Sequence, residues 1–170
     1  MMRKKPMLAY PVSSKPIDYT NKISMQPKLD GVRCVIQYDA GVVTAYSRTG
    51  KQWKNIEHIT LNLYKFFNKH PNVILDGELY NHDLRNDFEQ IISIVRRQKP
   101  DDIDMLNSRE MVQFHCYDAI DELVKFNNRY LWLTKFVPES YCVKHVKTQA
   151  VPTESLSKVV HQQNINATKA

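Results

Sequence analysis

Glycine is scarce in this chain, with four residues among 170. Glycine-rich phosphate loops, such as the Walker A turn or the GxGxxG turn of dinucleotide-binding folds, need glycines in close spacing. Gly31, Gly41, Gly50 and Gly77 have no such spacing. Any nucleotide that the chain binds must therefore be held by side chains.

Paired cysteines and long apolar runs are also lacking. Cys34, Cys116 and Cys142 have neither CxxC nor Cys/His spacing, so neither a zinc site nor a disulfide framework is indicated. Cys34 and Cys116 lie in strand-like segments, where a buried thiol behaves as a small apolar group. No apolar run approaches the roughly 18 residues that cross a membrane, and the basic N-terminus continues into Pro6 without a signal-peptide core. We expect a cytosolic protein.

Positive charge is in excess but unevenly spread. The net charge is +6 and the pI is about 9.2. Residues 1–60 hold ten Lys/Arg against four Asp/Glu, residues 61–120 seven against ten, and the remainder seven against four. This distribution fits a polyanionic partner such as nucleic acid. A solvated basic surface is the alternative, and charge alone does not decide between them.

The spacing of apolar residues changes between two periods along the chain. Strand-like patterns predict strands at residues 32–38, 42–46, 73–80, 112–118 and 141–146, and helical spacing predicts helices at residues 55–71, 87–97 and 128–136. Asn86 and Glu89 resemble a capping box before the second helix, which residues 99–102 end. A weak pattern at residues 156–160 hints at a short helix. The mixture predicts one α+β domain with mostly antiparallel sheets and flanking helices.

The stretch Gln26-Pro27-Lys28-Leu29-Asp30-Gly31-Val32-Arg33 combines an amine, a carboxylate, a glycine and a guanidinium. These are the groups that a nucleophile facing a polyphosphate needs. The Lys28 amine, with an ordinary pKa of about 10.4, becomes nucleophilic only when it loses a proton. A divalent metal, Arg33 or Arg48 is expected to supply the positive charge that lowers this pKa.

Three more polar clusters follow in the sequence. Residues 47–51, Ser-Arg-Thr-Gly-Lys, offer two cations and two hydroxyls that suit a phosphate or a ribose. Asp76 and Glu78 share one strand face and suit a sugar hydroxyl or Mg²⁺. Tyr117 offers an aromatic plane for stacking on a base. Taken singly, each cluster is more often a turn, a strand end or a core residue, and a lone Lys–Asp contact is most often a weak surface ion pair.

Taken in order, the clusters resemble the motifs of the covalent nucleotidyltransferases, the superfamily of ATP-dependent DNA ligases and mRNA capping guanylyltransferases. Residues 28–33 resemble the KxDGxR nucleophile motif, and residues 47–50 the SRxG motif that follows it in DNA ligases. Residues 76–80 resemble the DGE motif, and residues 114–118 the aromatic-Asp motif. The spacings are similar to those of small viral or phage ligases, and the resemblance covers about residues 7–130.

The resemblance implies the adenylation domain of a DNA ligase, which resembles an ATP-grasp fold, and a three-step reaction. Lys28 would attack the α-phosphorus of ATP and become lysyl-AMP. AMP would pass to the 5′-phosphate of a nick, and the 3′-OH would seal the strand. ATP and Mg²⁺ are the implied cofactors and nicked double-stranded DNA the implied partner. A monomer without membrane association is expected, in the host cytoplasm if the source is viral or phage, acting in DNA replication, repair or recombination.

The resemblance also implies roles for the site residues. Arg33 and Arg48 would contact the nucleotide sugar or the 5′-phosphate of the nick, and Glu78 the ribose hydroxyls or the metal. Tyr117 would stack on adenine, and the backbone near Gln26 would recognise the adenine amino group. The remaining motif residues would support the site: Asp30, Gly31, Asp76 and Asp118.

The chain departs from the family pattern in two respects. Gln26 stands where many ligases carry Glu. The later Glu-Gly motif, the KxK motif and the OB-fold domain of the family have no counterpart, since no later Glu precedes a Gly and Lys144 and Lys147 are wrongly spaced. We therefore expect residues 1–170 to be a partial adenylation domain without the OB-fold domain, with weak or absent self-adenylation.

Two other functions stay open at this stage. A capping guanylyltransferase is disfavoured because residues 47–50 have the ligase form. A catalytically inactive module that binds nicks or DNA would keep the fold and the basic surface but not the chemistry. Offering ATP against GTP separates the first from a ligase, and a search for an AMP adduct separates the second.

Overall fold

A computed structural model describes residues 1–8, 10–11, 13–21, 23–84 and 87–151. Its elements follow in chain order: β1 (Ile23–Met25), β2 (Val32–Asp39), β3 (Val42–Tyr46), α1 (Glu57–Lys69), β4 (Ile74–Tyr80), the 3₁₀ helix η1 (His82–Leu84), α2 (Phe88–Val95), α3 (Asp102–Met111), β5 (Gln113–Ala119), α4 (Phe126–Phe136), β6 (Val143–His145) and β7 (Gln149–Val151). The weak pattern at residues 156–160 and Asn86 of the expected capping box lie outside the described residues.

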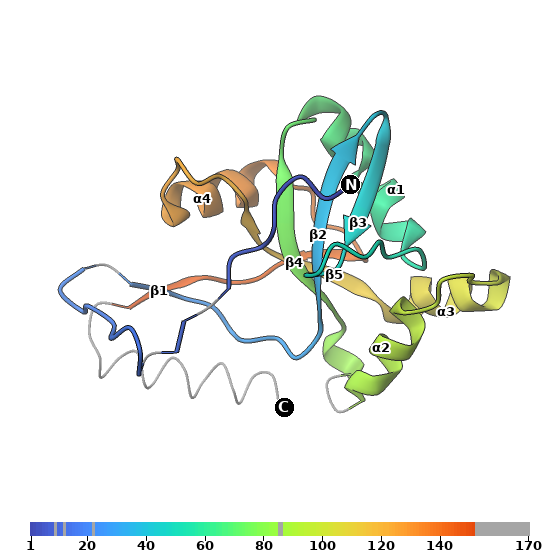
Figure 1. Cartoon of the computed structure of the whole chain (residues 1–170), viewed down its shortest axis with the longest axis horizontal. Helices are drawn as coiled ribbons and strands as arrows, with labels where there is room; N and C mark the ends of the chain where they lie inside the picture. Colours follow the sequence, from blue (N-terminus) through green and yellow to red (C-terminus); the bar gives the residue numbers. More distant parts are fainter. Residues whose placement is uncertain (9, 12, 22, 85–86, 152–170) are drawn as a thin grey trace.

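The strands form two sheets (Figure 1). The larger has the order β3-β2-β4-β5-β6, in which all neighbours are antiparallel except the parallel pair β5 and β6. The smaller pairs β1 with β7, antiparallel, and lies at one end of the molecule. The predicted α+β fold with mostly antiparallel sheets and flanking helices is confirmed.

The apolar core covers one face of the larger sheet. Because side chains alternate along a strand, Cys34 and Ile36 of β2 point to this face, where they pack with buried residues of α1, α2 and α4. The ring of Phe66 in α1 meets that of Trp132 in α4, with centroids 6.1 Å apart, so these two helices lie on the same side. Each large side chain buried here contributes about 1.5 to 3 kcal/mol. Polar residues at the alternate positions are left for the opposite face.

The N-terminal segment runs across strands β2 and β4 (Figure 1). The backbone N–H of Arg3 donates to Oε1 of Gln37 at 2.7 Å, and Nε2 of Gln37 donates to the carbonyl of Met1 at 3.0 Å. Further along, the guanidinium of Arg33 donates to the carbonyl of Met7 at 3.3 Å. These contacts satisfy Gln37, which is fully buried, and place the segment beside Arg33.

Four elements were not expected from the sequence, among them the short 3₁₀ helix η1. Helix α3 follows directly where residues 99–102 were expected only to end a helix, because Asp101 caps it and forms a reciprocal capping box with Asp104. Its only buried residue is Ser108, so it shows little apolar periodicity. Strands β1 and β7 have three residues each, too few for a pattern. No helix among the described residues is long and apolar enough to cross a membrane.

Candidate functional site

Lys28 lies in the loop between β1 and β2, with 85% of its side chain exposed. Its Nζ contacts Oδ1 of Asp30 at 2.7 Å. This hydrogen bond raises the pKa of Lys28, with a smaller contribution from the negative charge of Glu78. The pKa of Lys28 therefore moves opposite to the lowering expected from Arg33 or Arg48. Arg33 and Arg48 do not supply the charge, since Arg33 is paired elsewhere and Arg48 is exposed after β3.

Gly31 brings the Lys28 loop close to β4. A Cβ atom at this position would collide with the backbone oxygen of Leu79 and would lie 2.6 Å from Cγ of Glu78. Only a residue without a side chain permits such an approach. The glycine of the Lys28 motif therefore sets the Lys28 loop beside Glu78.

Arg33 of β2 and Asp76 of β4 form a bidentate ion pair. Nε of Arg33 lies 2.7 Å from Oδ1 of Asp76, and Nη2 lies 2.5 Å from Oδ2. Burial raises the pKa of Asp76, and the hydrogen bonds from Arg33 oppose that rise. The same guanidinium lies 5.2 Å from the centre of the Tyr117 ring, a distance at which a cation is attracted to the ring. Arg33 thus joins the carboxylate of β4 to the aromatic ring of β5.

Glu78 occupies the middle of the polar face. It lies opposite Arg33 of β2 on one side and opposite His115 of β5 on the other. Burial raises the pKa of Glu78 from 4.5 to about 7. The described residues contain no group of three or more His, Cys, Asp or Glu arranged to hold a metal. Mg²⁺ is often held by one or two carboxylates together with substrate phosphates, and a single ionised Glu78 fits that mode.

The pKa of Glu78 predicts how stability depends on pH. The folded chain binds this proton more tightly than the unfolded chain, so the contribution of Glu78 to the free energy of unfolding is greatest below a pH of about 4.5. It is expected to fall by roughly 2 to 3 kcal/mol as the pH rises through about 7 and the buried carboxylate ionises. Urea unfolding across this range checks the slope. Glu78→Gln should flatten it, and an equal slope in that variant would show that another group is responsible.

Tyr117 is the extra residue of a β-bulge in β5. Asp118 pairs with Asp76, and Cys116 pairs with the next residue, Gly77, so Tyr117 has no partner in β4. Bulges re-aim a side chain and are common beside functional sites. The carbonyl of Tyr117 accepts a hydrogen bond from Nε2 of Gln26 at 3.1 Å. Burial raises the pKa of the Tyr117 phenol, so the ring stays neutral.

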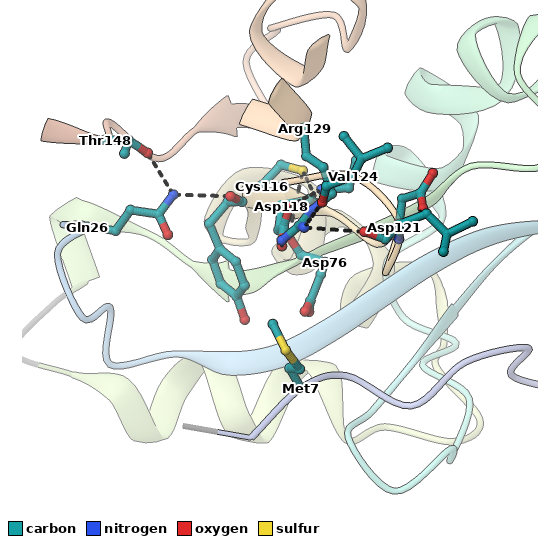
Figure 2. A network of polar contacts seen from close by, with 12 residues as sticks. Met7, Gln26, Asp76, Cys116, Asp118, Asp121, Val124, Arg129 and Thr148 are labelled. Atoms are coloured by element: carbon teal, nitrogen blue, oxygen red, sulfur yellow. Dashed lines mark hydrogen bonds and ion pairs between the residues drawn. The ribbon is translucent and has the colours of Figure 1, made fainter. Parts of the chain in front are cut away.

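Gln26 ties three segments together through its side chain. Besides Tyr117, its Nε2 donates to Oγ1 of Thr148 at 2.9 Å (Figure 2). A carbonyl can only accept, so the amide nitrogen must face Tyr117 and Oε1 must point elsewhere. Gln26 therefore fixes the entry to the Lys28 loop against β5 and the segment before β7.

The match to a protein family decides which class of protein this is. Residues 6–168 match the family model described as ATP dependent DNA ligase domain. The chain belongs to the ATP-dependent DNA ligase domain family. A search of the curated proteins finds no match.

Solved structures, among them two titled as DNA ligases, share the fold of this ligase domain. A structure named Pmar-Lig_Pre has a TM-score of 0.69 at 21% identity. The match covers 95% of this chain and 39% of that structure's chain. A structure from an analysis of DNA binding by Lig E DNA ligases has a TM-score of 0.67 at 19% identity, covering 98% and 59%. The ATP complex of the ATP-dependent DNA ligase of bacteriophage T7 has a TM-score of 0.58 at 18% identity, covering 84% and 53%. The ligase domain thus spans between 39% and 59% of these structures.

The ligase domain brings most of the expected site residues together on one face of the sheet. Hydrogen bonds, ion pairs, strand pairing or close charges link one member to the next: Gln26, Lys28, Asp30, Gly31, Arg33, Asp76, Glu78, Tyr117 and Asp118. Arg48 is not joined to them by any described contact. Thr148 and Arg129, which binds Asp118, were missed, because both come from segments that carry no motif.

A cavity between two helices lies away from this face. It has a volume of about 690 Å³ between α1 and α3, and His58, Leu61, Met105 and Arg109 are among the residues that line it. None of its lining residues belongs to the ligase site. This cavity is therefore separate from the polar sheet face that carries Glu78 and Arg33.

Proposed function

We propose that this domain transfers AMP from ATP to Lys28 and then to DNA. The Lys28 nitrogen forms a bond to the α-phosphorus while the bond to the pyrophosphate oxygen breaks. Asp30 would accept the amine proton, a role that its distance of 2.7 Å from Nζ supports. The phosphoramidate then gives AMP to the 5′-phosphate of a nick, and the 3′-OH displaces AMP to seal the strand.

The clustering of Lys28 with Glu78, Arg33 and Tyr117 is the observation that carries this proposal. Transfer of a phosphoryl or nucleotidyl group depends mainly on positioning and on offsetting charge. Glu78 is the residue that would hold Mg²⁺ or the ribose hydroxyls, and Mg²⁺, when bound, would offset charge on the phosphates. Tyr117 would stack on adenine, a contact worth about 1 to 3 kcal/mol.

Nicked duplex DNA is the proposed partner. The net charge of +6 and the exposed Arg48 and Lys51 beside the hairpin offer cations for phosphate contacts. Binding through phosphates weakens steeply as salt rises. A monomer that acts in DNA replication or repair in the cytoplasm is part of the same proposal.

Mass spectrometry of the purified chain tests the proposal. After incubation with Mg²⁺ and ATP, we expect one AMP on the peptide that contains Lys28, and no GMP after incubation with GTP. The expectation of weak self-adenylation stays a prediction that the yield of this reaction measures. A GMP adduct would instead favour the guanylyltransferase. Absence of any adduct, with salt-sensitive DNA binding retained, would favour the inactive DNA-binding module.

A further inference from the structure

The guanidinium of Arg129 in α4 makes four hydrogen bonds at the end of β5. Its Nε and Nη2 donate to the two carboxylate oxygens of Asp118 at 2.8 and 2.7 Å. Its Nη1 donates to the carbonyls of Asp121 at 3.3 Å and Val124 at 2.5 Å (Figure 2). The side chains of Arg129 and Asp118 are 12% and 13% exposed. A planar fork of this kind is specific to arginine, and a lysine cannot reproduce it.

Asp118 is placed to influence the Tyr117 bulge directly. It follows Tyr117 in the chain and lies opposite Asp76 in the sheet. Like charges directly opposite each other destabilise a strand pair, and Asp118 does contribute to raising the pKa of Asp76. Each carboxylate has its own arginine, Arg33 for Asp76 and Arg129 for Asp118.

Removing Arg129 would disturb this pairing of two carboxylates with two guanidinium groups. Asp118 would keep its negative charge beside Asp76 without its own arginine. Arg33 would then have to offset the charge of both carboxylates. Arg33 is also the cation that lies against the Tyr117 ring. Replacing Arg129 would therefore change the position of the Tyr117 ring in two ways. It would release the backbone of the bulge, and it would change the contacts of Arg33.

We propose that Arg129 is a positioning residue for the surface on which Tyr117 receives adenine. By binding Asp118, Arg129 fixes the bulge. Arg33 then keeps its ion pair with Asp76 and its contact with the Tyr117 ring. Arg129 itself touches no substrate. The identity of the ligand as adenine rests on the proposed function, whereas the coupling of Arg129 to Tyr117 and Arg33 does not.

Self-adenylation kinetics test the role in nucleotide binding. Self-adenylation is a single-turnover reaction, so KM here means the ATP concentration that gives half the maximal rate, and kcat means that maximal rate. In Arg129→Lys the KM is expected to rise about tenfold, while kcat stays within about threefold of the wild type. Arg97→Lys is the matched control, because Arg97 pairs with Asp104 in α3 at 3.5 Å, outside the site, and should leave KM unchanged. Arg129→Gln alone should raise the KM. Adding Asp118→Asn, which makes the pair neutral, should reverse part of that rise. An unchanged KM in Arg129→Lys, or a loss confined to kcat, overturns the proposal.

NMR of the full chain provides a measurement that does not need activity. The signals of Arg33 Nε–H and of the Tyr117 ring are expected to shift in Arg129→Lys and to stay fixed in Arg97→Lys. If these signals do not move, the proposal is wrong even where adenylation is slowed. If the wild-type chain takes no AMP, the proposed function fails, and the NMR shifts alone decide whether Arg129 positions Tyr117. Should Arg129→Lys not fold, Asp118→Asn takes its place in both measurements, because it weakens the same ion pair without leaving an unpaired carboxylate beside Asp76. An unchanged KM and unchanged signals in that variant would again overturn the proposal.

Discussion

Replacing Lys28 with arginine is expected to abolish the AMP adduct, a loss of at least about a thousandfold in the rate of self-adenylation. Arginine keeps the positive charge and the ion pair with Asp30, but its guanidinium stays protonated in proteins and offers no nucleophilic nitrogen. Radiolabelled ATP followed by gel analysis, together with mass spectrometry of the Lys28 peptide, measures the loss.

Lys65→Arg is the matched control for this experiment. Lys65 is an exposed lysine of α1, the helix that packs on the core face of the sheet, so its replacement should leave the adduct unchanged. An adduct that survives in Lys28→Arg at the wild-type level would show that another lysine is the nucleophile. The folding of both variants can be compared by their unfolding curves, because neither change buries or uncovers a core residue.

The contact between Lys28 and Asp30 explains why the amine alone is not a ready nucleophile. A hydrogen bond at 2.7 Å and a raised pKa mean that Lys28 is protonated near neutral pH. In the proposed reaction, attack on phosphorus requires this proton to leave, and Asp30 would accept it. The proposal therefore expects the arriving nucleotide and its counterions to activate Lys28 by changing the charge around it.

Local sequence patterns account for most of the fold and for most of the site. The hairpin of β2 and β3, helix α1 and strand β4 follow from apolar periodicity, which depends on neighbouring residues only. The site residues could be named because each belongs to a short motif. The ion pair of Arg129 with Asp118 could not be predicted from the sequence, because it joins residues 11 positions apart in different elements. The bulge at Tyr117 also had no local signal, because it depends on how β5 pairs with β4.

The charge state of Lys28 shows a second limit of sequence reasoning. The sequence places Arg33 five positions after Lys28, close enough to suggest that its charge acts on the amine. In the fold, alternation along β2 turns Arg33 toward Asp76 on the neighbouring strand, while Asp30 stays beside Lys28. Which of two nearby charges acts on a group depends on side-chain direction, and that direction is set by the sheet.

Gly77→Ala is expected to destabilise the fold by about 3 kcal/mol or more, a large part of the 5 to 15 kcal/mol typical of a domain. A Cβ atom at Gly77 would lie 2.5 Å from the backbone oxygen of His115 and 2.5 Å from a ring carbon of Phe114. Neither neighbour can move easily, because His115 is held in the strand ladder and Phe114 is fully buried. Equilibrium unfolding in urea or guanidinium measures the change.

Gly41→Ala provides the comparison that isolates packing from backbone conformation. Gly41 has a φ of +89° in the turn between β2 and β3, with nothing within 4 Å of an added Cβ, so the change should cost only about 1 to 2 kcal/mol. Equal losses of stability in the two variants would mean that Phe114 leaves room for a side chain at Gly77.

The site explains why a glycine suits position 77. Asp76 and Glu78 must both face the polar side of β4, so the residue between them faces the core, where Phe114 leaves no room for a side chain.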